Sequence, residues 1–257
     1  MFRTSPARLA RLALVLIVVV PLVSAVAEDK ATLTADEALQ HLKDGNQRFV
    51  DGKTKNPNSD AARRTETAKE GQHPFVTILG CSDSRVPLER VFDYGIGDLF
   101  VVRVAGNVAG SDELGSIEYA AGHLHTPLLV VLGHTKCGAV GAAVEKAPVA
   151  GFLKPLVALI APAVERAHEK TPQAAGDALV VAAIKENVWQ SIADTLTKSA
   201  EVRELVETGK LKVVGALYNV ETGQVEWLGP HPEQDRLLHA EKKEEAKGAP
   251  AKAGAKP

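Results

Sequence analysis

The sequence predicts an α/β fold in which helices cover both faces of a mainly parallel sheet. Its short apolar runs are apolar at successive positions, which is typical of strands that are buried on both faces. Longer segments with helical periodicity separate these runs, and this alternation favours parallel strands joined by helical crossovers. The strands are expected at residues 75–80, 99–104, 128–133 and 211–218, with residues 225–228 available to pair with the last of them as a hairpin.

The expected helices have start signals and apolar faces. The first begins at a capping box formed by Thr34 and Glu37 and extends to about Gly52. The second opens with Ser111 and two acidic residues, which suit a helix N-terminus, and extends to residue 124. Three further helical segments are expected at residues 138–145, at 153–169 with interruptions at Pro155 and Pro162, and at 181–196.

The first 27 residues resemble a cleavable export signal. Three arginines precede an uncharged stretch that ends in Ala25-Val26-Ala27, the pattern that signal peptidase cuts. A retained membrane anchor is the alternative, but the sixteen uncharged residues from 12 to 27 are short for a span of about 20 residues. We therefore expect cleavage after Ala27 and a periplasmic protein.

Composition places the remaining chain in one globular domain. Of the 257 residues, 45% are hydrophobic and 24% are charged, which is ordinary for a soluble protein with a sizeable core. Removal of the signal leaves 27 basic against 32 acidic side chains, a net charge of −5. This balance argues against nucleic acid as a partner. The domain is expected at residues 28–240, followed by a disordered polar tail at 241–257.

Chemically reactive side chains follow two of the predicted strands. Cys81 and Asp83 come directly after the first strand, and His134 and Cys137 come after the third. Ligands of parallel sheets gather at the carboxyl ends of the strands, so these side chains are expected to lie together. Two thiolates, an imidazole and a carboxylate form a ligand set typical of tetrahedral Zn²⁺. We expect one zinc ion per subunit.

Simpler interpretations exist for each of these residues. Cys81 and Cys137 are the only cysteines, and an exported protein commonly pairs its cysteines in a disulfide. His134 alone can be a core histidine, and Asp83 can form an ordinary ion pair with Arg85 in a turn. A disulfide, however, gives no purpose to His134 and Asp83. Zinc is the interpretation that uses all of these side chains.

Arg85 bears on whether the zinc site is structural or catalytic. If Asp83 binds the metal, the fourth position is filled and the site is structural. If Asp83 pairs with Arg85 instead, a water molecule can take that position, and zinc lowers the pKa of bound water from about 15.7 to roughly 7. The arginine therefore favours a catalytic site that uses hydroxide at neutral pH.

Four motifs stand in a characteristic order and spacing along the chain, namely CSDSRVP, GDLFVVRVAGN, GSIEYA and LGHTKCGAV. Through them the chain resembles the β-class carbonic anhydrases from residue 33 to residue 229. The resemblance implies the reversible hydration of carbon dioxide to bicarbonate and a proton by a zinc-bound hydroxide. It also implies a Rossmann-like parallel sheet with an antiparallel edge strand, and a homodimer or higher oligomer in which the N-terminal helices embrace the partner through Leu39, Leu42 and Phe49.

The resemblance also implies roles for individual residues. The zinc ligands are Cys81, His134 and Cys137, and Asp83 and Arg85 form a catalytic dyad in which Asp83 can also be the fourth ligand. The substrate-binding positions are Gln72, which acts across the dimer interface, the pocket-wall residues Phe100, Ala105 and Tyr119, and the backbone amide of Gly138. Ala105 is smaller than the valine that is common there in plant members.

His123 matches a proposed proton-relay position, four residues after Tyr119. An imidazole is suited to proton transfer near neutral pH. The alternative is an ordinary exposed histidine on a helix.

Two rival functions share these residues. A hydrolase of carbon disulfide or carbonyl sulfide would use the same zinc site on another linear substrate. A non-catalytic periplasmic zinc-binding protein would also need the ligands, but it has no need of Arg85.

Overall fold

The fold is described by a computed structural model over residues 33–239. The expected export signal and the expected polar tail at 241–257 lie outside the described residues. Within residues 33–239, none of the helices is long and apolar enough to cross a membrane.

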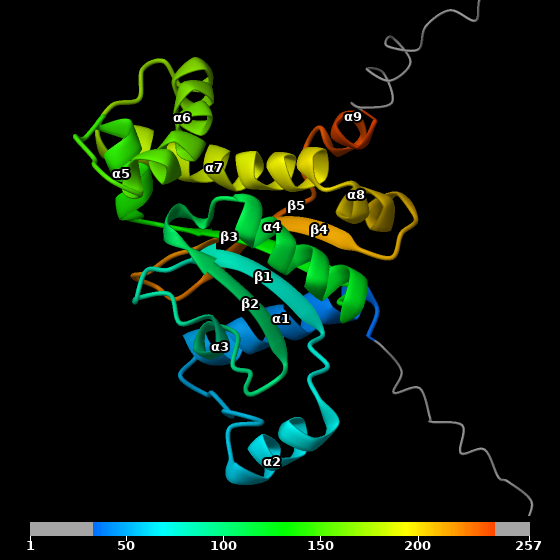
Figure 1. The fold of residues 1–257 in the computed structure, drawn as a ribbon. Helices are drawn as coiled ribbons and strands as arrows, with labels where there is room; N and C mark the ends of the chain where they lie inside the picture. Colours follow the sequence, from blue (N-terminus) through cyan, green and yellow to red (C-terminus); the bar gives the residue numbers. More distant parts are fainter. Residues whose placement is uncertain (1–32, 240–257) are drawn as a thin grey trace, which may run out of the picture. The chain divides into compact units, whose positions relative to one another are not determined.

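A five-stranded sheet forms the centre of the fold (Figure 1). The strands lie in the order β2-β1-β3-β4-β5, the first four are parallel, and β5 runs antiparallel to β4 at one edge. This arrangement confirms the predicted fold class and the antiparallel edge strand. The strands are β1 (Val76–Cys81), β2 (Leu99–Val104), β3 (Leu128–His134), β4 (Lys212–Tyr218) and β5 (Val225–Gly229).

Helices bury both faces of the sheet because successive strand residues point to opposite faces. On one face, Ile78 of β1 packs with Leu42 of α1 (Ala35–Val50) and with the short helix α3 (Leu88–Val91). On the other face, Leu79 packs with the helices α4 (Ser111–Glu118), α7 (Asp177–Lys198) and α8 (Ala200–Glu207) (Figure 1). The continuous apolar runs are thus explained by burial on two sides.

A third apolar cluster lies around the reactive cysteines. It joins α5 (Gly138–Val144), α6 (Leu153–Lys170) and the first half of α7, and it contains both cysteine side chains. Ile160 of α6 is fully buried in it. Cys81 at the end of β1 and Cys137 after β3 are therefore enclosed by helices instead of facing solvent.

The prediction that Pro155 and Pro162 interrupt a helix is wrong, because α6 is continuous through both residues. Pro155 lies in the first turn, where a backbone N–H has no partner inside the helix. Pro162 lies on the exposed side of the helix, where water can bind the carbonyl group that it leaves free.

Four helices and the short turn η1 add to the elements expected from the sequence, and one expected helix is divided. The segment at 111–124 forms α4 followed by a π-helical turn, η2 (Tyr119–His123), and a short turn, η1 (Ala105–Asn107), follows β2. The capping box at the start of α1 is confirmed. The unexpected helices are α2 (Ala61–Glu70), α3, α8 and α9 (Gln234–Leu238).

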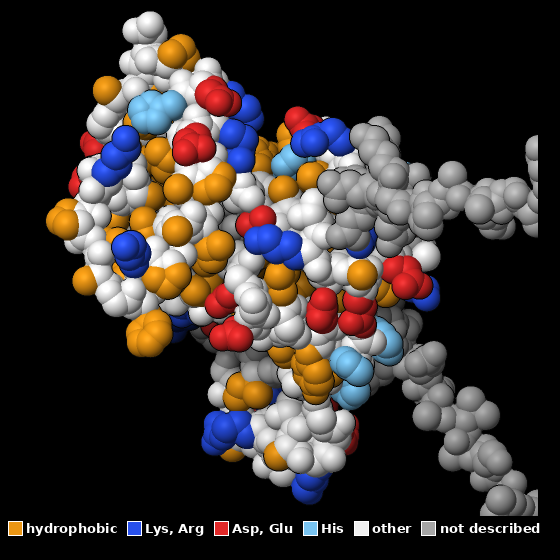
Figure 2. Space-filling model, turned by 45° about the horizontal axis from the view of Figure 1, so that its top comes forward, with side chains coloured by type: hydrophobic (Ala, Val, Ile, Leu, Met, Phe, Trp, Pro, Cys, Tyr) orange, Lys and Arg blue, Asp and Glu red, His pale blue; other side chains and the backbone are white. Residues whose placement is uncertain are grey.

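Charged side chains of both signs are interspersed on the face that Figure 2 displays. Figure 2 shows lysine and arginine side chains beside acidic ones over the displayed face, without a continuous field of one sign. The sequence as a whole carries a formal charge of −2. This face offers no basic stripe of the kind that binds nucleic acid.

Candidate metal centre

Three buried side chains meet at the carboxyl ends of two adjacent strands. Cys81 ends β1, His134 ends β3, and Cys137 immediately precedes α5. One ligand atom from each lies within 4.8 Å of the others. The pairing of β1 with β3 brings Cys81 and His134 together, and the tight turn after His134 adds Cys137.

The hydrogen bonds of His134 leave one ring nitrogen available to a metal. Its Nδ1 lies 2.9 Å from the carbonyl oxygen of Thr135, so we assign the ring proton to Nδ1, which donates to that oxygen. Nε2 is then an acceptor, and it is buried without a partner among the described residues. A histidine that ligates a metal is usually held in this way by its other nitrogen.

Both cysteines are free thiols. The neighbouring Cys137 thiol and His134 ring hold the pKa of Cys81 below its usual range. The interaction with Cys81, together with burial, raises the pKa of Cys137. Two sulfur ligands and one imidazole nitrogen around a single point fit Zn²⁺, whose charge favours the thiolate form of both cysteines.

The carboxylate of Asp83 forms a bidentate ion pair with the guanidinium group of Arg85. Arg85 donates from Nε to Oδ1 at 2.9 Å and from Nη2 to Oδ2 at 2.7 Å, and its backbone N–H also donates to Oδ1 at 2.9 Å. The Arg85 side chain holds the pKa of the Asp83 carboxyl well below its usual range. Oδ2 lies 3.9 Å from Nε2 of His134, so the carboxylate borders the three-ligand cluster without belonging to it.

Three further hydrogen bonds hold the ion pair and the backbone beside it, and two of them come from Arg103, a residue that sequence reasoning missed. Arg85 also donates from Nη2 to the carbonyl oxygen of Lys136 at 3.0 Å. Arg103 of β2 donates to the carbonyl oxygens of Cys81 and Asp83 at 2.9 and 2.6 Å. The sequence feature that could have pointed to Arg103 is that it is a single charged residue within the apolar run of β2. Arg103 fixes the backbone of both Cys81 and Asp83.

The expected substrate-binding residues fall into two groups. Ala105 follows the end of β2, and Gly138 begins α5 directly after Cys137, so both lie in the segments next to the metal ligands. A Cβ atom placed on Gly138 would meet nothing within 4 Å, so the space beside it is open.

The second group lies at the other end of β2. The rings of Phe100 and Tyr119 are 6.1 Å apart, those of Tyr119 and His123 are 5.5 Å apart, and Tyr119 lines a surface pocket together with Gln72. Phe100 precedes Val104, the neighbour of Cys81 in the sheet, by four residues, or about 13 Å along the strand. A single chain therefore does not place this group beside its own metal ligands.

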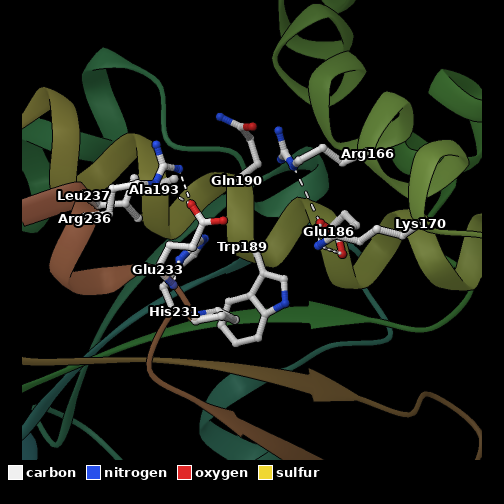
Figure 3. A pocket seen from close by; sticks show the side chains of 11 residues that line it. Arg166, Lys170, Glu186, Trp189, Gln190, Ala193, His231, Glu233, Arg236 and Leu237 are labelled. Atoms are coloured by element: carbon white, nitrogen blue, oxygen red, sulfur yellow. Dashed lines mark hydrogen bonds and ion pairs between the residues drawn. The ribbon is translucent and has the colours of Figure 1, made fainter. Parts of the chain in front are cut away.

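A separate charged pocket of about 160 Å³ lies between α6, α7 and the segment from β5 to α9 (Figure 3). Glu186 of α7 accepts from Lys170 at 2.8 Å and lies 3.6 Å from Nε of Arg166. Glu233 pairs with Arg236. Its lining does not include Cys81, His134 or Cys137.

Comparison with known proteins agrees with this geometry. Residues 76–225 match the carbonic anhydrase family. The chain is 39% identical to carbonic anhydrase 2 of Mycobacterium tuberculosis over 191 residues, which is 73% of this chain and 89% of that protein. It is 38% identical to a carbonic anhydrase of Mycolicibacterium smegmatis, with 74% of this chain and 91% of that protein covered.

Solved structures identify the class. The β-carbonic anhydrase CafA of Aspergillus fumigatus superimposes with a TM-score of 0.63 at 31% identity, covering 70% of this chain and 86% of that one. The chain belongs to the β-class carbonic anhydrases. A tetrameric β-carbonic anhydrase of Sordaria macrospora matches with a TM-score of 0.60 at 25% identity, covering 66% of this chain and 87% of that one.

Membership of this family makes the chain an enzyme, a zinc-dependent lyase that interconverts carbon dioxide and bicarbonate. This confirms the expected activity and cofactor. Cys81, His134 and Cys137 are the three described side chains that can hold the zinc together.

Proposed function

We propose that this carbonic anhydrase hydrates carbon dioxide at the centre formed by Cys81, His134 and Cys137, with the ion pair of Asp83 and Arg85 as its catalytic dyad. The observation that carries the proposal is the position of Asp83: its carboxylate borders the ligand cluster but is bound to Arg85. These three side chains would hold the zinc, which when bound would lower the pKa of a water molecule to about 7 and so provide a nucleophile at neutral pH.

Asp83 orients the reacting oxygen by accepting its hydrogen bond. Because Arg85 lowers the pKa of this carboxyl group, Asp83 stays ionised at neutral pH and acts as an acceptor rather than as a proton donor. Oδ2 lies 3.9 Å from Nε2 of His134, so this carboxylate oxygen borders the three side chains that would hold the metal. Because Arg85 binds both carboxylate oxygens, it would keep Asp83 from binding a metal held by the three side chains, and the carbonyl group of Lys136 holds Arg85 in place.

The decisive experiment measures carbon dioxide hydration by stopped flow with the zinc-loaded protein. Release of sulfide from carbon disulfide and carbonyl sulfide is measured in parallel, and the same protein stripped of zinc is the control. We expect zinc-dependent hydration of carbon dioxide to exceed turnover of either sulfur compound. Zinc-loaded protein that holds one ion per chain without hydrating carbon dioxide would overturn the proposal, as would a preference for the sulfur analogues.

We further propose that the working unit is a homodimer or a higher homo-oligomer joined along β2. Within residues 33–239, β2 is an edge strand with no hydrogen-bonded neighbour on its outer side, although it carries the apolar side chains of Phe100, Val101 and Val104. Such an edge is a template for pairing with another chain. Two-fold pairing would bring the Phe100 end of one β2 beside the Val104 end of the other, and so unite the two groups of substrate-binding residues.

A subunit-mixing experiment tests this arrangement. His134→Ala chains lack a metal ligand, and Gln72→Ala chains lack the amide that is expected to act across the interface. If Gln72 serves the partner's site, mixing the two inactive variants after dissociation restores a share of the hydration activity. If it serves its own site, no activity returns. Sedimentation of the wild-type protein as a monomer at micromolar concentration would also contradict the proposal.

We propose that the protein is exported to the periplasm of a bacterium and that residues 28–240 form its catalytic domain. The support is the basic start, the uncharged stretch and the Ala25-Val26-Ala27 pattern of the sequence. Mass spectrometry of the periplasmic fraction should show Glu28 as the first residue. Membrane-bound protein with Met1 intact would contradict export by cleavage.

A further inference from the structure

The turn η1 lies directly behind the sulfur of Cys81. The backbone N–H of Gly106 donates to Sγ of Cys81 at 3.3 Å, and the contact is buried. Hydrogen bonds to a metal ligand fix its orientation and tune its bond to the metal. The position of this turn therefore bears directly on how the Cys81 sulfur meets a metal.

The turn has a backbone conformation that its surroundings must maintain. Gly106 has φ 73° and Asn107 has φ 46°, so two successive residues are left-handed. This region is unfavourable for residues with a side chain, although asparagine tolerates it better than most. A Cβ atom on Gly106 would lie 2.8 Å from Cδ1 of Ile160, which shows how closely α6 packs against the turn.

Two side chains of α7 clamp this turn. Asn187 donates from Nδ2 to the carbonyl oxygen of Gly106 at 2.7 Å, and Ser191 donates from Oγ to that of Asn107 at 2.8 Å. Both residues are 1% exposed, and their spacing of four places them on the same face of the helix. Helix α7 thus binds the carbonyl groups of two consecutive residues of the turn, Gly106 and Asn107. The backbone N–H of Gly106 is directed at the sulfur of Cys81.

The amide side chains beside this turn are buried at a cost in the free energy of folding. Nδ2 of Asn107 and Oδ1 of Asn187 are buried and have no hydrogen-bond partner in the part of the chain that the structure describes. A buried amide with unpaired atoms costs more than an apolar side chain of the same size. Stability alone therefore does not account for Asn187, whereas positioning of the turn does.

We propose that Asn187 and Ser191 are positioning residues that hold η1 so that the Gly106 amide stays directed at the Cys81 sulfur. The inference rests on the proposed zinc site. Loss of either side chain allows the turn to change its position and so weakens the hydrogen bond from Gly106 to the Cys81 sulfur. The bond between this sulfur and the metal then becomes weaker. None of the ligands is changed, so the effect appears in the strength and electronic character of the metal–sulfur bond.

The test uses full-length Asn187→Leu and Ser191→Ala proteins loaded with zinc or with cobalt. Leucine matches the size of asparagine without its hydrogen bonds, and alanine removes only the serine hydroxyl. We expect zinc transfer to a chelator to be about 10-fold or more faster in Asn187→Leu, in the range typical of residues that support ligands, and faster to a lesser degree in Ser191→Ala. In the cobalt forms, the sulfur-to-cobalt charge-transfer band should shift.

Thr195→Val is the matched control. Thr195 is buried one turn further along α7, and its hydroxyl donates to the carbonyl oxygen of Ser191 within the same helix, not to the turn. This variant should lose stability without a change in zinc release or in the cobalt band. Zinc release and cobalt spectra like wild type in both Asn187→Leu and Ser191→Ala would overturn the inference while leaving the proposed function intact. Failure of the wild-type protein to retain zinc would overturn both.

Discussion

The metal centre and the charged pocket of Figure 3 are both polar clusters beside α7, but they differ in how their polar atoms are satisfied. In the pocket, protein groups meet one another: Glu186 pairs with Lys170, and Nδ1 of His231 accepts from the backbone of Glu233 at 3.0 Å. In the metal centre, Nε2 of His134 is a buried acceptor without a partner in the described residues. A cluster whose polar atoms all have protein partners stabilises the fold, whereas a buried polar atom without a protein partner indicates a site for a ligand.

The strongest test of this contrast is removal of a ligand. His134→Ala should bring the zinc content well below one ion per chain and reduce carbon dioxide hydration by about 10³-fold or more, because water without a metal keeps a pKa of about 15.7. Metal analysis and stopped-flow hydration measure both effects. A variant that retains stoichiometric zinc would show that His134 is not a ligand.

Arg85→Ala should separate catalysis from metal binding. Without its partner, the Asp83 carboxylate can turn the short distance onto the metal and displace the reacting water, so hydration should fall by about 10²- to 10⁴-fold, the range of a lost proton-handling group. Zinc should remain at one ion per chain, because Cys81, His134 and Cys137 are unchanged. Full zinc together with near-wild-type hydration would contradict the role of the dyad.

Glu186→Gln tests the charged pocket, next to Asn187 in the sequence. Glutamine keeps the shape of the side chain but weakens its bond to Lys170, so the free energy of unfolding should fall by about 1 kcal/mol. Zinc content and hydration rate should stay within about twofold of wild type. Urea unfolding and stopped flow provide the readouts, and a loss of zinc would show that the two clusters depend on each other.

The smallest expected effect is a pH dependence from His231. Burial lowers the pKa of this histidine, so the unfolded chain, with a pKa near 6.5, takes up the proton more readily than the folded protein. The stabilisation is complete above about pH 6.5 and is lost as the pH falls through the folded pKa. In His231→Gln, the free energy of unfolding should fall less between pH 8 and pH 5 than in wild type. Equal slopes in the two proteins would contradict this role.

The sequence predicted the parts of the fold that follow from local patterns. The ligand pairs could be placed at neighbouring strand ends because Cys81 and His134 each follow a continuous apolar run, and such runs pair in parallel. Helix α2 had no comparable signal, since none of its residues is buried and it has no apolar face. The break expected at Pro162 failed because the exposed side of a helix tolerates proline better than the sequence pattern indicates.

The supporting residues of the site depend on tertiary contacts. Asn187 and Ser191 lie within an amphipathic helix, where polar residues usually face solvent, and only the packing of α7 against η1 shows that both are buried on the turn. Arg103 is similar, because its role follows from the register that places it beside Gly80 and next to the end of β1. The positions of Gln72, Phe100 and Tyr119 came from family resemblance, since their spacing predicts no common site.

The pairing of β1 with β3 sets the order in which the protein can assemble. These strands are neighbours in the sheet, but β2 and α4 lie between them in the chain, so their contact requires the closure of a long crossover. Local helices form before such a contact. High-affinity zinc uptake during refolding should therefore follow the helical circular dichroism signal, and metal capture would mark the completion of the sheet. Capture that precedes the helical signal would contradict this order of assembly.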